Sequence, residues 1–355
     1  MSQHLVATVA VVARQNKQDQ TIQHHVAAQL GSHGFSPHCF VDGDPKILDC
    51  NIVLLIGAVS SMRQTVRQLE RHAKPKPKVA IWLFEPLPPP DMPIAHIKLA
   101  ARLSPIHTGK RWMKPIMHLL SRPLDAVLGQ QYVGEFSVSM LRFLIDNFAL
   151  IERGQRKGWL NHIVTSTEQK RVYLAEHEIT AQFLPIGQQP VFGEHQGLKR
   201  DIDVLFIGSL KNTHRQEQLK AMMSRLSRMG LTTYVPNEPI WGQARTQLVN
   251  RAKILLHIHN LKWDTPWMRW YLASANGAVV ATSPLSVEYP LRPDIDYLSA
   301  DADSLPDEIY ALAIDENRRE KMVKSLQDRI AAKMTCARSV AELASHLHRL
   351  LNSGV

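Results

Sequence analysis

A first group of polar residues follows a buried, strand-like run near position 205. The run DIDVLFIGS ends in Gly208 and Ser209, and the helical pattern after it carries Lys211 and Arg215 near its start. A glycine allows a ligand to approach closely, while helix N–H groups and cations attract phosphate oxygens. The single glycine and the missing G-K-[ST] ending exclude the dinucleotide fingerprint and the Walker loop. The segment therefore predicts a diphosphate cradle, with an ordinary strand-to-helix turn as the structural alternative.

A second group follows the apolar run ILLHIHN. His257, His259 and Asn260 stand at its end, and Asp264 and Arg269 lie in the next loop and helical pattern. Because alternate residues of a strand share a face, the two histidines could form an H-x-H metal pair. No motif supplies a third ligand, so we predict no metal. We expect these polar groups to converge at the carboxyl end of the strand.

A parallel sheet is needed to position both groups. In the first half, strand-like runs at 5–12, 38–41, 51–56, 79–84, 162–166 and 181–185 alternate with helical patterns at 21–30, 63–72 and 137–153. In the second half, strands at 203–207, 232–235, 254–258 and 278–282 alternate with helices at 213–229, 243–251 and 266–276. Helical patterns follow at 305–314, 317–333 and 339–351. Such alternation predicts right-handed βαβ units.

The two halves are separated by a polar stretch without periodicity. This stretch, 188–200, is punctuated by glycine and proline, as a linker should be. We predict an α/β protein with two doubly wound, Rossmann-like domains at 1–187 and 201–335. The closing segment 336–355 could pack back on the first domain.

The composition narrows the function classes only partly. The net charge of +10 predicts an anionic partner, which could be nucleic acid, an acidic membrane surface or a phosphate-bearing small molecule. The stretch 102–122 is basic and amphipathic, which suits peripheral contact with an anionic membrane or, alternatively, a solvated helix packed on its own domain. Three cysteines without pairing and no apolar run long enough to span a membrane favour a cytoplasmic location.

The second half resembles a known family. Phe206, Gly208 and the downstream Arg215, then the run Leu256-His257-Ile258-His259, then Arg269 through Gly277 in the pattern RWYLASANG resemble the C-terminal domain of group-1 glycosyltransferases. Within that superfamily they are similar to the spore-maturation branch. The resemblance covers about residues 201–333 and implies a GT-B architecture, with two Rossmann-like domains facing across a cleft.

The resemblance also implies an activity. A GT-B enzyme binds a nucleotide-sugar through its C-terminal domain and transfers the sugar to a glycan, lipid or protein acceptor at its N-terminal domain. Lys211, Arg215 and Arg269 would stabilise the phosphate leaving group without metal, and backbone groups near Asn237 could read the base. Trp267 could stack on a base or a sugar, whereas Trp270 is expected in the core.

Two departures from the family pattern bear on that activity. Leu272 stands where the family commonly has a glutamate that holds the donor's ribose, and His257 replaces an asparagine. Asp264 lies eight residues before Leu272, the interval of the related E-x7-E motif, so it could be the surviving acid of that pair. The alternative is a noncatalytic GT-B-fold protein that binds an anionic ligand or a partner.

The first half should supply the acceptor side. A general base is needed there in an inverting enzyme, and Glu85, which follows a strand and opens the proline-rich loop EPLPPPDMP, is the first candidate. The alternative for Glu85 is a structural cap. Asn16 and Gln18 could line the acceptor side, with His162 and Glu135 as weaker candidates. A nucleic-acid ligand would explain the charge but none of these residues, and no base-reading module is present.

Overall fold

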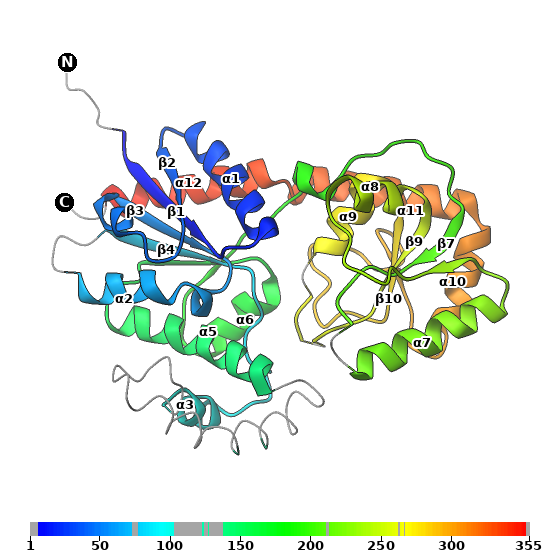
Figure 1. The fold of residues 1–355 in the computed structure, drawn as a ribbon, viewed down its shortest axis with the longest axis horizontal. Coiled ribbons are helices and arrows are strands. Elements are labelled where there is room, and N and C mark those ends of the chain that lie inside the picture. Colours follow the sequence, from blue (N-terminus) through cyan, green and yellow to red (C-terminus); the bar gives the residue numbers. More distant parts are fainter. Residues whose placement is uncertain are drawn as a thin grey trace. The chain divides into compact units, whose positions relative to one another are not determined.

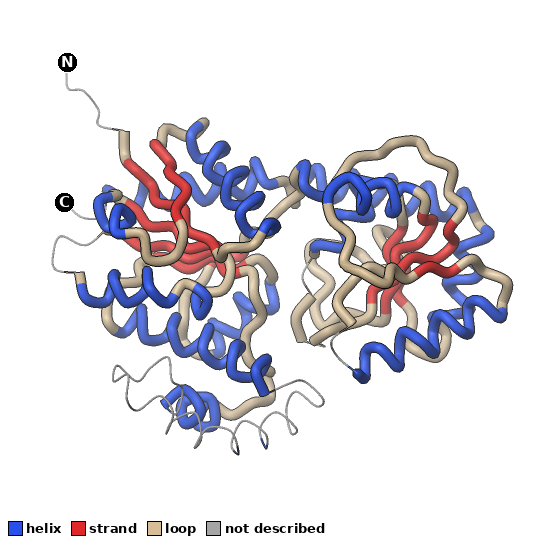
Figure 2. Tube along the Cα trace, in the orientation of Figure 1, coloured by secondary structure: helices blue, strands red, loops and turns tan. Residues whose placement is uncertain are grey.

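The structure is a computed structural model that describes residues 6–72, 77–102, 123, 127, 138–210, 213–261, 263–265 and 267–352. It divides into two compact units. Unit 1 comprises Met1–Leu184 and Ser339–Val355, and unit 2 comprises Pro185–Arg338. Each unit is an α/β layer structure built on a parallel sheet, as Figures 1 and 2 show.

Unit 1 contains a parallel sheet with strand order β2-β1-β3-β4-β5-β6. Its central strands are buried along their whole length because helices cover both faces, which is why they read as continuous apolar runs. The strands are β1 (Thr8–Ala13), β2 (Ser36–Phe40), β3 (Ile52–Ile56), β4 (Lys78–Leu83), β5 (His162–Thr165) and β6 (Gln182–Phe183).

The helices of unit 1 include one from the end of the chain. This helix, α12 (Cys336–Asn352), stacks the ring of His348 on Phe35 and the ring of His346 on His162. Aromatic stacking and buried apolar positions of α12 therefore attach the end of the chain to the first sheet. The other helices are α1 (Lys17–Gly31), α2 (Arg63–Arg71), α3 (Ile94–Arg102), α5 (Val138–Arg156) and α6 (Glu168–Glu176).

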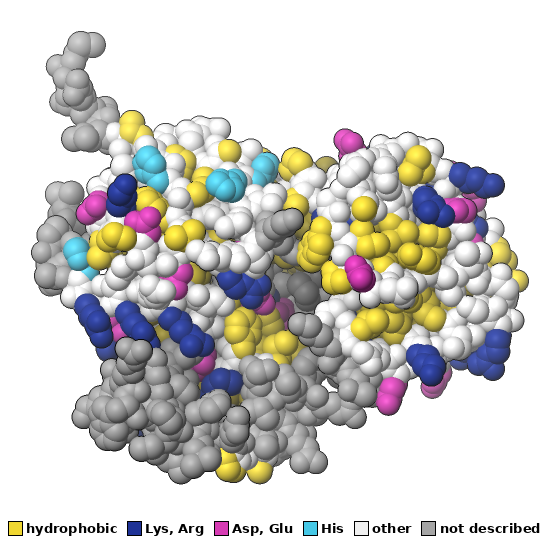
Figure 3. Space-filling model, in the orientation of Figure 1, with side chains coloured by type: hydrophobic (Ala, Val, Ile, Leu, Met, Phe, Trp, Pro, Cys, Tyr) yellow, Lys and Arg dark blue, Asp and Glu magenta, His cyan; other side chains and the backbone are white. Residues whose placement is uncertain are grey.

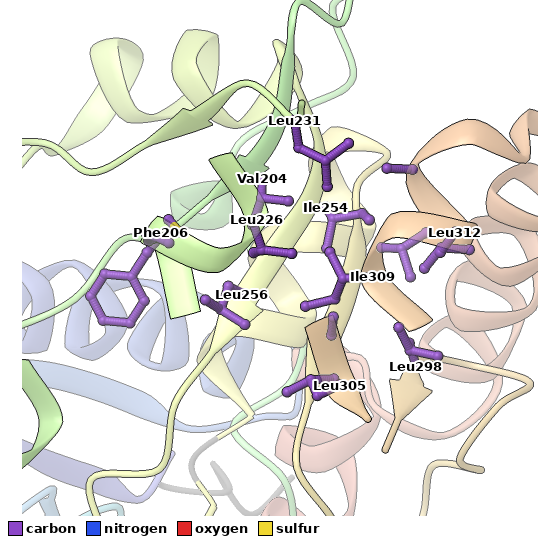
Figure 4. Close-up of a cluster of buried hydrophobic side chains, with 14 of the residues drawn as sticks. Val204, Phe206, Leu226, Leu231, Ile254, Leu256, Leu298, Leu305, Ile309 and Leu312 are labelled. Carbon is purple, nitrogen blue, oxygen red and sulfur yellow. The ribbon is translucent and has the colours of Figure 1, made fainter. Parts of the chain in front are cut away.

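Unit 2 contains a second parallel sheet with strand order β11-β10-β9-β7-β8. The strands are β7 (Ile202–Leu205), β8 (Thr233–Tyr234), β9 (Ala252–His257), β10 (Val279–Thr282) and β11 (Leu298–Ser299). The helices are α7 (Thr213–Arg228), α8 (Gly242–Asn250), α9 (Met268–Asn276), α10 (Leu305–Ile314) and α11 (Glu316–Lys333). Figure 4 shows how Val204 and Ile254 of the sheet meet Leu226 of α7 and Ile309 of α10 in one core.

The stretch 188–200, which the sequence predicted to be a linker, is part of unit 2. Phe192 is buried, and its carbonyl accepts a hydrogen bond from Asn276 Nδ2 at 2.9 Å. Asn250 Nδ2 donates to the carbonyl of Glu194, also at 2.9 Å. Two amide side chains of α8 and α9 thus satisfy the backbone of a segment whose regular structure in this range includes the short 3-10 helix Pro190–Phe192. Apolar periodicity carries no sign of such contacts.

Two further elements differ from the sequence expectation. α6 (Glu168–Glu176) buries Lys170 and Gln169 together with Tyr173 and Leu174, so its polar composition hid it. β11 pairs with β10 over only two residues and gives too short a pattern to detect. No helix in the described ranges has a stretch long and apolar enough to span a bilayer.

Candidate functional site

The turn after β7 brings a glycine against two arginines. Phe206 is fully buried, and Gly208 follows it at an exposed bend before α7. A Cβ placed on Gly208 would overlap Arg269 Nη2 and would lie 3.1 Å from Phe206 Cζ and 3.4 Å from Arg215 Nη2. Glycine is required here because the guanidinium groups lie directly against the backbone.

Arg215 holds the ends of two strands together. It lies in the first turn of α7 and is 4% exposed. Its Nη1 donates to the carbonyl of Ser209 and its Nη2 to the carbonyl of Ile258, each at 2.9 Å. One guanidinium therefore connects the loop after β7 to the loop after β9.

Arg269 also connects the end of β7 to the end of β9. It lies in the first turn of α9, where its Nη2 donates to the carbonyl of Ile207 at 2.7 Å. Its Nη1 donates to Nδ1 of His257, the last residue of β9, at 2.8 Å. His257 thus positions Arg269. Among the described residues, no carboxylate lies within ion-pair distance of Arg269.

Both guanidinium groups lie over one aromatic ring. The Cζ atoms of Arg215 and Arg269 are 5.1 and 5.4 Å from the centroid of Phe206. Burial lowers the pKa of Arg215 to about 10, and burial together with the charge of Arg215 lowers the pKa of Arg269 to about 9. Both side chains are still protonated at pH 7. Two like charges held together in a partly dry environment strongly attract a divalent anion.

The histidines beside this pair are neutral at pH 7. Burial and then the charge of Arg269 lower the pKa of His257 well below 6.5, and burial also lowers the pKa of His259. His259 Nε2 lies 3.2 Å from the carbonyl of Ser283 and donates to it. In the part of the chain that the structure describes, no group of three His, Cys, Asp or Glu residues is placed to hold a metal ion.

The tryptophans behind the histidines are core residues. Trp270 is fully buried and contacts His257 at 5.2 Å, Trp267 at 5.3 Å and Tyr297 at 5.7 Å between ring centroids. Trp267 is 2% exposed. Both rings therefore lie in the core beneath the site and are not accessible to a ligand.

The other predicted residues of unit 2 differ in how deeply they are buried. Asn260 and Asn237 are exposed, after β9 and β8 respectively. Asp264 and Leu272 are 5% and 7% exposed. Lys211 lies outside the described residues.

The predicted residues of unit 1 occupy different places on its sheet. Glu85 is half-buried after β4, at the carboxyl edge. Asn16 caps α1, since its Oδ1 accepts from the backbone N–H of Asp19 at 2.8 Å. Gln18 lies in the first turn of α1, but its side chain is outside the described part. His162 begins β5 and so lies at the opposite, amino edge. Glu135 lies outside the described residues.

The surface of unit 1 carries part of the positive charge. Arg63, Arg67 and Arg71 recur every four residues on α2 and are all exposed, and Figure 3 shows a row of Lys and Arg side chains over this helix. The stretch 102–122, for which we predicted membrane contact, lies outside the described residues apart from Arg102.

The sequence analysis named Phe206 as part of the family motif but gave it no role, and it did not predict the backbone carbonyls of the site. Phe206 supplies the ring beneath both arginines, while the carbonyls of Ile207 and Ile258 orient them. A large aromatic residue two positions before the turn glycine was the available signal for Phe206. Backbone carbonyls leave no such signal.

Comparison with known proteins identifies the fold. Residues 201–345 match a family model described as glycosyl transferase-like. A comparison with curated protein sequences found no significant match.

Solved structures extend the likeness to both units. A TarM variant from S. aureus, in complex with UDP and sugars, superposes with a TM-score of 0.55 at 8% identity over 85% of this chain. This chain spans 55% of the length of that protein. Anabaena HepE, in complex with UDP and glucose, also gives 0.55 at 8% identity, over 97% of this chain and 100% of HepE. An apo structure of OtsA gives 0.51 at 10% identity, over 83% of this chain and 72% of OtsA.

These relatives share their architecture with this chain, in both units. The parallel sheets with interleaved helices and the likeness to TarM and HepE show that the chain has the GT-B fold.

Proposed function

We propose that this protein is a nucleotide-sugar-dependent glycosyltransferase whose unit 2 binds the diphosphate of the donor at Arg215 and Arg269. The observation that carries the proposal is the placement of two guanidinium groups over Phe206, against Gly208 and next to the start of α7. The match of unit 2 to the glycosyl transferase-like family supports it. UDP is the first nucleotide to test, because the TarM and HepE structures contain it.

The arginine pair suits the leaving group of glycosyl transfer. The bond between the anomeric carbon and the diphosphate oxygen breaks, and negative charge develops on that oxygen. Fixed cations and backbone N–H groups stabilise this charge without reorganising, which lowers the barrier. Because His257 and three backbone carbonyls already hold the guanidinium groups, little side-chain entropy is lost when the donor binds.

The remaining assignments complete the proposal. The acceptor oxygen bonds to the anomeric carbon, and Glu85 accepts its proton if the enzyme inverts configuration. Gly208, Ser209, Lys211, Asn237, His259 and Asn260 would contact the donor, and Asn16 and Gln18 the acceptor. The charge of Arg215 and Arg269 would replace a metal ion. The acceptor class, the cytoplasmic location and the spore-maturation branch stay predictions.

The noncatalytic alternative rests on Leu272. Its side chain is buried in α9 and, being aliphatic, has no polar group that could bind a ribose. A binding protein would bind a nucleotide or another anion but would not cleave a nucleotide-sugar. Release of UDP from UDP-sugars over time, with UDP binding as the reference, separates the two functions.

Thermal shift with a panel of nucleoside diphosphates, followed by calorimetric titration, tests the proposal. We expect stabilisation by one of them, of about 2.7 kcal/mol at a hundred times its Kd. The Arg269→Gln variant should raise that Kd at least tenfold, since a hydrogen bond to a charged group contributes roughly 1.5–3 kcal/mol. Arg318→Gln, a partly exposed arginine on α11, is the matched control. A protein that no nucleotide stabilises would contradict the proposal, as would an Arg269→Gln variant that binds as the wild type does.

A further inference from the structure

A cavity opens at the edge of the unit 2 sheet opposite the arginine pair. Its volume is about 880 Å³, and a neighbouring hollow of about 450 Å³ shares His195, Arg200, Lys253, Glu316 and Arg319 with it. It is bordered by the amino ends of β7 and β9, the end of α10 and the start of α11. The Gly208 turn follows the carboxyl end of β7, so the two places lie at opposite edges of one sheet.

Two guanidinium groups line this cavity without a carboxylate partner. Arg319 Nη1 donates to the carbonyls of Leu312 and Ala313 at 3.0 and 2.6 Å. Arg200 donates to the carbonyls of Ala252 and Asn276, the latter at 2.8 Å. Among the described residues, neither has an acid within ion-pair distance. Burial and the charge of Arg319 both lower the pKa of Arg200, so the two positive charges act on one another.

The backbone holds one of these groups in place. A Cβ on Gly277 would lie 2.6 Å from Arg200 Nη2, so only glycine leaves room for the guanidinium there. Lys253 also lines the cavity, but Asp203 neutralises it at 2.6 Å. Glu316 opposes the positive charge from the exposed first turn of α11, where the helix N-terminus stabilises its carboxylate.

Part of the cavity lining is apolar and open to solvent. Tyr310, Ile314 and Leu198 are 37%, 67% and 41% exposed, although they are large hydrophobic side chains. A ligand that combines an anionic group with an apolar one would contact both the two arginines and these apolar side chains.

We propose that this cavity binds a small phosphate monoester with an apolar or aromatic part, its phosphate on Arg200 and Arg319 and its apolar part on Tyr310 and Ile314. The site is separate from the donor site in the same unit, so its occupant is an effector and not a substrate of the transfer. The inference does not depend on the proposed glycosyltransferase activity.

Phenyl phosphate is the probe, with inorganic phosphate and phenol as its two halves, titrated calorimetrically into the full chain. We expect phenyl phosphate to bind more tightly than either half. Arg200→Gln and Arg319→Gln should each weaken it at least about tenfold. Glu316→Gln should tighten it, because an opposing charge is removed. Arg269→Gln should leave it unchanged, and UDP should not compete.

Tyr310→Ser keeps the test decisive if the arginine variants lose their fold. This substitution of an exposed residue should weaken the binding of phenyl phosphate and leave the binding of inorganic phosphate unchanged. Absence of phenyl phosphate binding up to about 10 mM overturns the proposal. So does binding that Arg269→Gln or UDP abolishes, because the probe would then occupy the arginine pair of the donor site. Failure of UDP to bind at all would count against the proposed function alone.

Discussion

The carboxyl edges of the two sheets hold their positively charged side chains in different ways. In unit 2, two guanidinium groups lie behind an exposed turn formed by Gly208 and Ser209. In unit 1, Lys170 is 1% exposed and donates to Thr167 Oγ1 at 3.1 Å, so its charge is turned into the unit. At the edge where ligands bind, unit 2 thus holds two arginines over one aromatic ring, whereas in unit 1 Lys170 is buried and Arg14 pairs with Asp19 at 3.2 Å.

This difference suits a division of labour between the units. The arginine pair of unit 2 suits an anionic donor, whereas the half-buried carboxylate of Glu85 in unit 1 suits the role of a proton acceptor. Fold alone would not separate the two roles, since function depends on the side chains placed at the edge.

We expect the largest effect from the Glu85→Gln substitution. We expect the rate of donor cleavage or transfer to fall by about 10²–10⁴, because a positioned base is lost, while Kd for UDP stays the same. UDP release from the nucleotide-sugar measures the rate, and calorimetry measures Kd. Asp91→Asn, an exposed acid of the same proline-rich loop, is the control. Loss of UDP affinity in Glu85→Gln would contradict the proposal that the two units have separate roles in donor binding and acceptor activation.

A smaller effect is expected from Gly208→Ala. The added methyl group would overlap Arg269 Nη2 and displace one guanidinium, so Kd for UDP should rise about tenfold. Gly31→Ala is the matched change in unit 1, because its Cβ would meet only Pro37 Cγ, at 4.0 Å. A Gly208→Ala variant with unaltered UDP affinity would show that the position of Arg269 does not matter for the donor.

A third effect concerns stability and the opposite edge of unit 1. Burial, followed by the charges of His346 and Arg349, lowers the pKa of His162 to about 4. Glu342 is the acidic residue on the same face of α12, where its carboxylate accepts a hydrogen bond from Gln182. Because the unfolded chain takes up this proton near pH 6.5, the stabilising contribution of neutral His162 is complete above pH 6.5 and is lost as pH falls to about 4.

The loss amounts to at most roughly 3 kcal/mol and should be absent in His162→Phe, which keeps a ring against His346. Urea unfolding at pH 7 and pH 4.5 measures it. Comparing the two proteins at each pH cancels the similar contribution of His257 in unit 2. An equal loss of stability in both proteins would mean that His162 does not titrate as described.

The sequence by itself determined the two parallel sheets, because buried parallel strands and amphipathic helices leave apolar patterns of different period. The bounds of β9 and α7 were predicted within two residues for that reason. The GT-B fold was predicted from the resemblance of residues 201–333 to group-1 glycosyltransferases. α6 was missed because its buried face carries Lys170 and Gln169, which a hydrophobicity pattern scores as exposed.

Only the tertiary structure decided how the candidate residues meet. Arg215 and Arg269 are 54 residues apart in the sequence, yet both lie over Phe206 because β7 and β9 are adjacent in the sheet. The same adjacency makes His257 a support for Arg269. Contacts of this kind run across neighbouring strands and through backbone carbonyls, and local residue patterns contain no information about either.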